Sequence, residues 1–461
     1  MLSFDSISPL DYRYYGNNPA IFNKLKPYLS ESALIEYMAL VEVALIAGLA
    51  EEGICSVEVV KEVKEAAMKI TAEEVYEEEK RIHHLLRALV NCLSKHVSPE
   101  NRRFIHLTAT SHDIICTAEA LRYKEFTQKI LLPKILELEK TFIHLALQEK
   151  ETVQIGRTHG QHAIPITFGF TLAEYVARIG ERIRALTKSA IRIRGQLSGA
   201  VGAYNAASLI INDPIEFEKK ILDKFEMRPG YHSTQIVSPE FMLDYIHNII
   251  SAFGVIANCA DDMRHLQRSE IGEVGELFGE KQVGSSTMPH KKNPVNFENV
   301  KGLYKATMPR IITLYMDQIS EHQRDLSNSA SSRYTAEIVA NFYVAIARMS
   351  RTMQNICVDP DALDKNLEMN KDKILAEPLY ILLAVNGCQD AHEKVRQLVM
   401  LADKENKKVI DLLSEDPELL QYYSKFTDQQ RAVLENPKKY IGKAVEKTEL
   451  VCNEWEKKLG L

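Results

Sequence analysis

CxxC pairs, the pattern of a signal peptide and a membrane-length apolar run are not found in this sequence of 461 residues. Its seven cysteines are scattered without a CxxC pair, which predicts a reducing compartment with neither a disulfide framework nor a zinc ribbon. The start of the chain lacks the basic and apolar stretches of a signal peptide. No apolar run approaches the ~20 residues of a membrane span. We therefore expect a cytoplasmic protein that does not enter a membrane.

An excess of positive charge is also absent. Lys and Arg total 57 against 63 for Asp and Glu, which gives a formal net charge of -6. Nucleic-acid binding needs cations in excess to displace counterions from phosphates, so this balance argues against a nucleic-acid partner. It leaves room for a local basic pocket that binds an anionic metabolite.

Several motifs of cofactor and metal chemistry are missing as well. The sequence has no Walker A run, no GxGxxG after a strand and no HExxH, and Ser198 stands one place too late for a GxSxG elbow. His159 and His162 have the spacing of metal ligands, but no nearby cysteine or acidic cluster completes a site. We expect neither a cofactor nor a metal.

Proline is absent over long stretches, and these gaps leave room for long helices. None occurs between Pro27 and Pro99, between Pro239 and Pro289, or between Pro309 and Pro360. An internal proline would remove a helix hydrogen bond and clash with the preceding turn. Because strand signals are also sparse, the sequence predicts a mainly α protein, and its length predicts two to four packed units.

The segment 238–267 fills one of these gaps. Ser238 is a good N-cap, and Pro239 suits the first helical position. Apolar residues then recur at spacings of three and four, the stripe of a long helix packed in a bundle. Thr71 with Glu74 predicts a capping box for another helix. Similar apolar patterns predict helices over roughly 32–50, 112–148, 168–195 and 300–320.

Four glycines precede a Ser-Ser pair in the segment 271–294, and lysine and asparagine follow shortly after it. Glycines at this density let the backbone adopt positive φ angles. Such a loop can present backbone amides, the Ser285 hydroxyl and the Lys291 cation to one oxyanion. A flexible surface connection is the plainer explanation of a glycine-serine loop, but the eleven-residue string from Gly284 to Pro294 is far more specific.

The run from Gly156 to His162 places two histidines in a short loop. Histidine can donate or accept a proton near neutral pH, which favours a catalytic role for His159. For His162 a structural role is about equally favoured.

Arg324 and Arg333 flank a run of hydroxyl side chains. Two guanidinium groups with serines between them suit bidentate recognition of a carboxylate or phosphate. By itself the pattern also fits a helix N-terminus with capping serines and solvent-facing arginines. Three dispersed groups become candidate site residues only if the fold brings them into one pocket with these segments. They are Arg13-Tyr14, His83-His84 and Thr110-Ser111-His112-Asp113.

The run from Gly284 to Pro294 resembles the G-S-S-x-M-P-x-K-x-N-P signature of the fumarase/aspartase superfamily and matches it at every fixed position. Within that superfamily, five further segments are similar to those of adenylosuccinate lyases. They are the S-P-x-D-x-R-Y opening at residues 8–14, G-R-T-H-G-Q at 156–161, Ser198-Gly199-Ala200-Val201-Gly202 followed by Tyr204-Asn205, Ser233-Thr234-Gln235, and the run from Arg324 to Arg333. The resemblance covers roughly residues 1–360, and beyond them only Ala376-Glu377-Pro378 is clearly similar.

Lyases of this family cleave adenylosuccinate to AMP and fumarate, and SAICAR to AICAR and fumarate, in purine biosynthesis. The resemblance implies that Ser285 is the base and His159 the general acid of the elimination. It implies that Glu298 orients the histidine and that Lys291 and Asn293 hold the substrate carboxylate. The further substrate contacts that it implies are Arg13, Tyr14, His83, His84, Thr110, Ser111, Gln235, Ser286, Arg324, Ser329 and Arg333.

The resemblance also implies the fold and the assembly. We expect a mainly α, three-domain lyase fold whose long central helical bundle assembles into a tetrameric core. The expected parts are an N-terminal helical domain (1–110), a central long-helix bundle domain that carries the signature loop (111–360), and a C-terminal helical domain (361–461). Active sites shared between subunits follow from such a homotetramer, with small purine nucleotides as the other partners.

Three positions depart from the family pattern. His84 stands where the family commonly has Asp, His112 replaces a serine of a T-S-S-D run, and His322-Gln323 occupy a place where a tryptophan often precedes Arg324. Two other functions stay open. The chain could be another fumarate-releasing lyase, such as an argininosuccinate lyase, or a helical-bundle protein whose catalysis has decayed. The presence of both Ser285 and His159 argues against decay.

Overall fold

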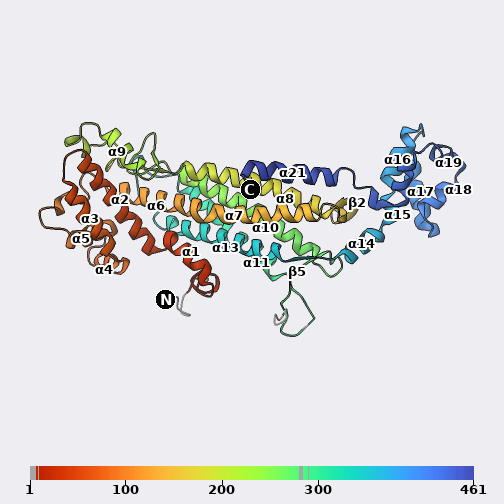
Figure 1. Ribbon diagram of the computed structural model, residues 1–461, viewed down its shortest axis with the longest axis horizontal. Coiled ribbons are helices and arrows are strands. Elements are labelled where there is room, and N and C mark those ends of the chain that lie inside the picture. Colours follow the sequence, from red (N-terminus) through yellow and green to blue (C-terminus); the bar gives the residue numbers. More distant parts are fainter. Residues whose placement is uncertain (1–6, 9, 280–283, 289) are drawn as a thin grey trace. The chain divides into compact units, whose positions relative to one another are not determined.

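The long helices predicted from the apolar stripes dominate the computed structural model, which describes residues 7–8, 10–279, 284–288 and 290–461 (Figure 1). Pro9 and Pro289, both part of the family motifs, lie outside the described residues. Contacts between Cα atoms divide the chain into two compact units, each made of three segments. The first unit comprises 1–136, 181–256 and 300–348, and the second comprises 137–180, 257–299 and 349–461. The three-domain division remains a prediction.

The structure confirms the predicted helices and shifts some of their ends. Three of them are single helices: α2 (Glu31–Glu51), α8 (Phe168–Ile191) and α10 (Glu240–Leu266). The stretch predicted over 112–148 consists of α6 (Ser111–Phe126) and α7 (Leu132–Gln148), joined by a π-helical turn. The stretch predicted over 300–320 consists of α11 (Val295–Thr307) and α12 (Ile311–Met316). Pro309 lies in the 3-10 turn between them, since proline cannot continue the helical hydrogen bonds.

In the first unit, α2 packs against α1 (Pro19–Leu29), α3 (Val57–Lys69), α4 (Ala72–Ile82), α6 and α9 (Pro214–Asp223), and α4 packs against α5 (Leu85–Lys95) (Figure 1). The ring of Phe126 lies edge-on to Tyr28 at 5.8 Å and to Tyr343 of α13 (Thr335–Gln354) at 6.0 Å. At the start of α4, the Thr71 hydroxyl accepts a hydrogen bond from the Glu74 amide at 3.2 Å, which is one half of the predicted capping box, while the Glu74 carboxylate accepts Lys95 Nζ at 2.9 Å.

The expectation that no apolar run approaches membrane length was wrong for the segment Pro19–Glu51, which is apolar enough to cross a membrane, with a mean hydropathy of 1.9 over its most apolar window. It is not one continuous helix, because Ser30 ends α1 and caps α2 by accepting a hydrogen bond from the Ala33 amide at 3.1 Å. Of the apolar window, 67% is buried inside the structure. Burial of this extent is typical of the core helix of a soluble protein.

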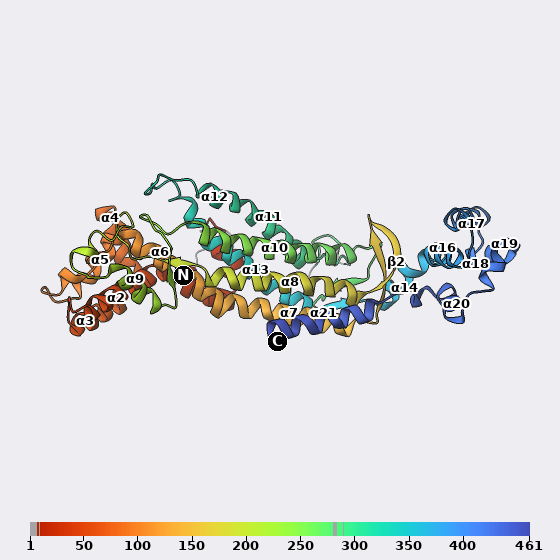
Figure 2. The same ribbon diagram turned by 90° about the horizontal axis from the view of Figure 1, so that it is seen from above.

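In the second unit, the hairpin of β1 (Val153–Thr158) and β2 (Gln161–Thr167) contacts α14 (Pro360–Met369) and α15 (Lys371–Ile374) (Figure 2). β5 (Val274–Glu276) pairs antiparallel with β6 (Ile356–Val358) just before α14. Later helices pack around a separate apolar core that includes Leu379, Leu383 and Leu413. They are α16 (Ala376–Val385), α17 (Ala391–Glu405), α18 (Val409–Glu415), α19 (Pro417–Tyr423) and α20 (Asp428–Glu435).

The last helix, α21 (Ala444–Leu459), is held by close contacts in the second unit. Trp455 is 5% exposed and lies directly on Gly180 of α8, where an added Cβ would come within 2.3 Å of the indole ring. Cys452 of α21 lies within electrostatic range of Glu139 of α7. Both Glu139 carboxyl oxygens are buried and have no hydrogen-bond partner among the described residues, and this burial raises the pKa of Glu139 to about 9.

Candidate active site

His159 stands at the tip of the β1–β2 hairpin. Thr158 and Gln161 are paired across the strands, so His159 and Gly160 form a two-residue turn with φ angles of 56° and 73°. Positive φ at both positions is the geometry of a type I′ turn, in which Asn-Gly is the favoured pair. A histidine held in the left-handed region costs about 1–2 kcal/mol, a cost often found at functional sites. The turn exposes the imidazole to solvent.

His162 has a different environment on the second strand. Its Nδ1 lies 3.0 Å from the side-chain nitrogen of Asn370. Burial, followed by the nearby Arg157 guanidinium, lowers the pKa of His162. A hydrogen-bonded, neutral imidazole favours the structural role for this residue.

Ser285 accepts two backbone hydrogen bonds inside the signature loop. The amides of Thr287 and Met288 donate to Ser285 Oγ at 3.4 and 3.1 Å. A serine hydroxyl is a weak base until its alkoxide is stabilised, and amide dipoles directed at the oxygen stabilise that charge. The loop thus supplies the donor groups that a serine base needs.

The rest of the loop is closed by backbone contacts around Gly284. An added Cβ at Gly284 would lie 1.9 Å from the Lys291 carbonyl oxygen, so only glycine permits this approach. The Asn293 side chain donates to the Gly284 carbonyl at 2.8 Å, while the Lys291 side chain is exposed. Glu298 is exposed in the first turn of α11.

In the first unit, hydrogen bonds bring together three predicted contact regions. The buried carboxylate of Asp113 accepts the Thr110 amide at 2.8 Å and also the amides of Ser198 and Gly199. The Gln196 side chain bridges Asp113 to the Gln235 carbonyl, at 3.3 and 2.6 Å. The Gln235 amide in turn donates to the carbonyl of Gln323 at 3.2 Å. Thr110, Ser111 and Gln235 therefore lie close to the segment that begins with Arg324.

Arg324 carries unsatisfied donors at this place. Its Nε and Nη1 atoms are buried without a hydrogen-bond partner among the described residues, while Nη2 bonds to Asn328. His112, which follows Ser111, is close enough for the Arg324 charge to act on it. Burial, and then Arg324, lower the pKa of His112. Buried guanidinium donors without a partner are suited to an anionic ligand.

His83 and His84 join two helices. His83 ends α4 in the left-handed conformation with φ 55°, and His84 Nδ1 accepts the Arg87 amide at 3.2 Å as the N-cap of α5. Both side chains are exposed. The departure from aspartate at position 84 is thus accommodated, because Nδ1 of the imidazole supplies the acceptor that a carboxylate oxygen would give.

The other predicted contact residues of the first unit lie at its surface. Arg13 is exposed and Tyr14 half-buried in the π-helical turn Leu10–Tyr14, and Ser329 and Arg333 are exposed. The Arg333 charge acts on Tyr76 of α4, which places the arginine near that helix. Ser286, in the second unit, is also exposed.

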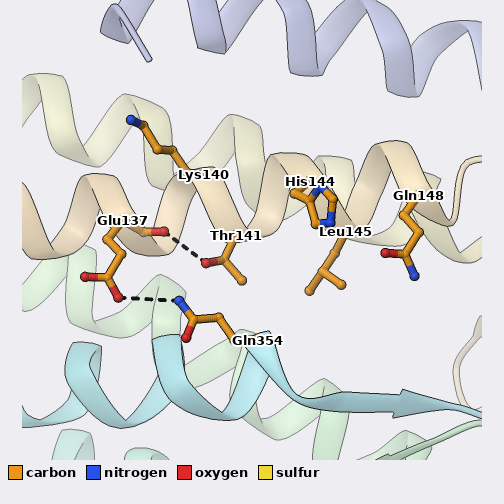
Figure 3. A pocket seen from close by; sticks show the side chains of 7 residues that line it. All are labelled: Glu137, Lys140, Thr141, His144, Leu145, Gln148 and Gln354. Atoms are coloured by element: carbon orange, nitrogen blue, oxygen red, sulfur yellow. Dashed lines mark hydrogen bonds between the residues drawn. The ribbon is translucent and has the colours of Figure 1, made fainter.

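A groove of about 370 Å³ follows α7 in the second unit but contains none of the predicted site residues (Figure 3). Its polar lining includes Glu137, Lys140, His144 and Gln354, and the Gln354 amide donates to Glu137 at 3.4 Å. Among the described residues, no three His, Cys, Asp or Glu side chains are grouped to hold a metal ion.

Two residues that hold the β1–β2 hairpin, Arg157 and Glu273, are not predicted from the sequence. Arg157 lies two residues before the hairpin turn and forms a 2.5 Å ion pair with Glu273, whose side chain is 0% exposed. The family motif at 156–161 contains Arg157, which is the signal that could have identified it. Glu273 carries no local signal, since its partners are distant in sequence.

Two family models match the chain. The model described as "Lyase" matches residues 13–308, and the model described as "Adenylosuccinate lyase C-terminal" matches residues 320–440. The second match extends the resemblance well beyond residue 360, where the sequence motifs thin out.

Curated proteins named adenylosuccinate lyase are similar over nearly the full length. The protein from Archaeoglobus fulgidus is 35% identical over 451 residues, which cover 96% of this chain and 98% of the relative. The protein from Pyrococcus abyssi is 35% identical over 457 residues, covering 97% and 98%. The protein from Thermotoga maritima is 30% identical over 410 residues, covering 87% and 92%.

Solved structures of two other enzymes have the same fold. The 3-carboxy-cis,cis-muconate lactonizing enzyme from Pseudomonas putida matches with a TM-score of 0.84 at 23% identity, covering 98% of this chain and 99% of that one. The fumarate lyase from Mesorhizobium sp. BNC1 matches with a TM-score of 0.82 at 21% identity, covering 94% and 97%. The predicted mainly α lyase fold is confirmed.

Proposed function

This chain belongs to the adenylosuccinate lyase family, and from that premise we propose that it eliminates fumarate from adenylosuccinate and from SAICAR with Ser285 as base and His159 as general acid. Ser285 Oγ takes the proton from the carbon beside a succinyl carboxylate. The electron pair left on that carbon forms the double bond of fumarate as the carbon–nitrogen bond breaks. The departing nitrogen takes its proton from His159.

The observation that carries this proposal is the pair of amides on Ser285 Oγ, at 3.4 and 3.1 Å. They support the alkoxide form that a serine base requires. Lys291, with its exposed ammonium, and Asn293 are proposed to hold the succinyl carboxylate on which negative charge develops. The strained, exposed position of His159 is compatible with an acid that must reach a substrate.

We propose that the first unit supplies the nucleotide site. Nε and Nη1 of Arg324, which have no partner in the part of the chain that the structure describes, are suited to a phosphate, and Thr110, Ser111 and Gln235 lie close to the segment that begins with Arg324. Ser111 opens α6, whose N-terminal dipole favours an anion. The remaining proposed contacts with the phosphate, the nucleotide and the succinyl group are Arg13, Tyr14, His83, His84, Ser286, Ser329 and Arg333.

Turnover of adenylosuccinate is the test of this function. We expect the purified protein to release fumarate and AMP from adenylosuccinate, followed by absorbance and by chromatography of the products. Argininosuccinate serves as the matched comparison, because it contains the same succinyl group but no phosphate for Arg324. Release of fumarate from argininosuccinate alone would instead support an argininosuccinate lyase. AMP binding without any turnover would support a protein whose catalysis has decayed.

Shared active sites are proposed from the exposure of two residues that should act together. Glu298 is expected to orient His159, yet no hydrogen bond joins their side chains within the described part of one chain, and both are exposed. We propose that Glu298 of one subunit meets His159 of another in a cytoplasmic homotetramer. Closed homo-oligomers of this kind commonly bury helical faces between subunits.

Mixing two inactive variants tests whether the active site is shared between subunits. Ser285→Ala and His159→Asn, unfolded and refolded together, are expected to regain about a quarter of wild-type activity, because random assembly gives about a quarter of shared sites both intact groups. Each variant refolded alone is the control. If the mixture stays as inactive as its components, base and acid come from the same chain.

A further inference from the structure

The carboxylate of Glu273 is buried and accepts four hydrogen bonds. Oε1 accepts Arg157 Nη2 at 2.5 Å and Asn366 Nδ2 at 2.8 Å. Oε2 accepts Gln154 Nε2 at 2.8 Å and Arg157 Nη1 at 3.1 Å. The Arg157–Glu273 pair is therefore bidentate, a geometry that fixes orientation as well as distance.

These bonds join three distant stretches of the second unit. Gln154 and Arg157 belong to the strand that leads to His159, Glu273 immediately precedes β5, and Asn366 belongs to α14. The Gln154 side chain is itself held by the Thr171 hydroxyl at 2.7 Å. The Asn366 amide also donates to the Ile271 carbonyl at 2.8 Å. The carboxylate is thus the point at which the hairpin, the strand before the signature loop and α14 meet.

The other end of β5 is fixed in a similar way. Glu276 accepts the amides of Asn296 and Phe297 at 2.8 and 2.9 Å and so caps α11, the helix that follows the signature loop. The Gln267 side chain links the Glu276 amide, at 3.0 Å, to the Lys292 carbonyl, at 3.2 Å. Both ends of the loop that carries Ser285 are therefore tied to β5.

The local backbone explains how Arg157 reaches inward. The register of the hairpin shifts between Ile155 and Arg157, and Gly156 approaches the Ile164 carbonyl so closely that a Cβ would lie 2.7 Å from it. A bulge of this kind re-aims the next side chain. Beyond Arg157 the hairpin consists only of the exposed turn, and a two-stranded hairpin is marginally stable without such support.

We propose that Arg157 and Glu273 are positioning residues for the elimination: their ion pair fixes the hairpin that presents His159 and the strand that anchors the Ser285 loop. The proposal rests on the proposed function, because it assumes that His159 donates the proton to the leaving nitrogen. Neither residue touches the substrate in this account. Their effect is to keep the acid within reach of the departing atom, where a displacement of about 1 Å can cost about 100-fold in rate.

Glu273→Gln is the main test, since it keeps the shape of the side chain and removes its charge. We expect kcat for adenylosuccinate to fall about 100-fold and KM to change by less than about 3-fold, because substrate contacts are retained. Leaving-group protonation should become slower, so the solvent deuterium isotope effect on kcat should increase. Arg157→Lys keeps the positive charge but loses the bidentate fork, and its kcat should fall about 10-fold.

Lys150→Met is the matched control, because it removes an ion pair of the same unit, Lys150 with Glu449 at 2.5 Å, whose side chains are 32% and 43% exposed. Its kcat should stay within about 2-fold of wild type. Wild-type turnover, abolished in His159→Asn, establishes the proposed function separately. The positioning proposal is overturned if kcat of Glu273→Gln is unchanged, or if it falls only in proportion to the folded fraction with an unaltered isotope effect. If Glu273→Gln does not fold, an unchanged kcat in Arg157→Lys overturns it.

Discussion

Asparagine in place of His159 is expected to lower kcat by about 10²–10⁴-fold, the usual contribution of a general acid, without loss of folding. The physical reason lies in the turn. His159 and Gly160 have φ angles of 56° and 73°, and asparagine is the residue that the first of these positions prefers. The substitution removes the proton donor while relieving backbone strain, so the Tm should stay the same or rise. Loss of activity then reports chemistry alone.

Steady-state kinetics and thermal unfolding of the same preparations measure both parts of this prediction. Asp390→Asn is the matched control, because Asp390 is another non-glycine residue of the second unit with a positive φ, 52°. It should keep wild-type kcat. An active His159→Asn enzyme would exclude His159 as the acid, and a lowered Tm would contradict the turn assignment.

Replacing Glu139 by glutamine is expected to remove a pH dependence of stability. The pKa of Glu139 is raised by burial to about 9 from an ordinary value of 4.5, so the folded protein keeps this carboxyl protonated. The unfolded chain ionises it at the lower pH. The stabilising effect of the retained proton is therefore complete below about pH 4.5 and is lost progressively as the pH rises towards about 9. At pH 8 the loss amounts to about 5 kcal/mol.

Urea unfolding of the wild type and of Glu139→Gln at pH 5.5, 7 and 8.5 measures this effect. The urea midpoint of the wild type should fall as the pH rises. The difference between the midpoints of the two proteins should therefore change in favour of Glu139→Gln. Glu151→Gln, at an exposed site just after α7, is the control and should follow the wild type. Parallel midpoints for wild type and Glu139→Gln would show that Glu139 does not titrate differently on folding.

The helices could be predicted from the sequence because each has a local sequence pattern. The apolar stripe of 238–267 and the Thr71 cap depend on spacings within one helix, and the structure contains both features. Ser285 could be predicted for another reason: the amides that contact it come from residues two and three places later, within the same motif.

The hairpin that carries His159 could not be predicted in this way. Its two-residue turn uses His-Gly in place of the usual Asn-Gly, and Pro165 within β2 argues against a strand. The Glu273 network has no local signal at all, because the carboxylate meets partners that lie between 93 and 119 residues away. Burial decides such contacts, and burial depends on the complete fold.

The placement of α21 has a practical consequence for following this protein in solution. Trp455 is the single tryptophan of the chain, and it is 5% exposed on Gly180, three residues from the cysteine that lies near Glu139. Its fluorescence emission therefore reports whether the last helix is docked. Red-shifted emission before loss of helical circular dichroism would mean that the C-terminal helix undocks first. Trp455 is thus an intrinsic fluorescent probe close to the buried carboxyl of Glu139, whose burial makes the folded state less stable at high pH.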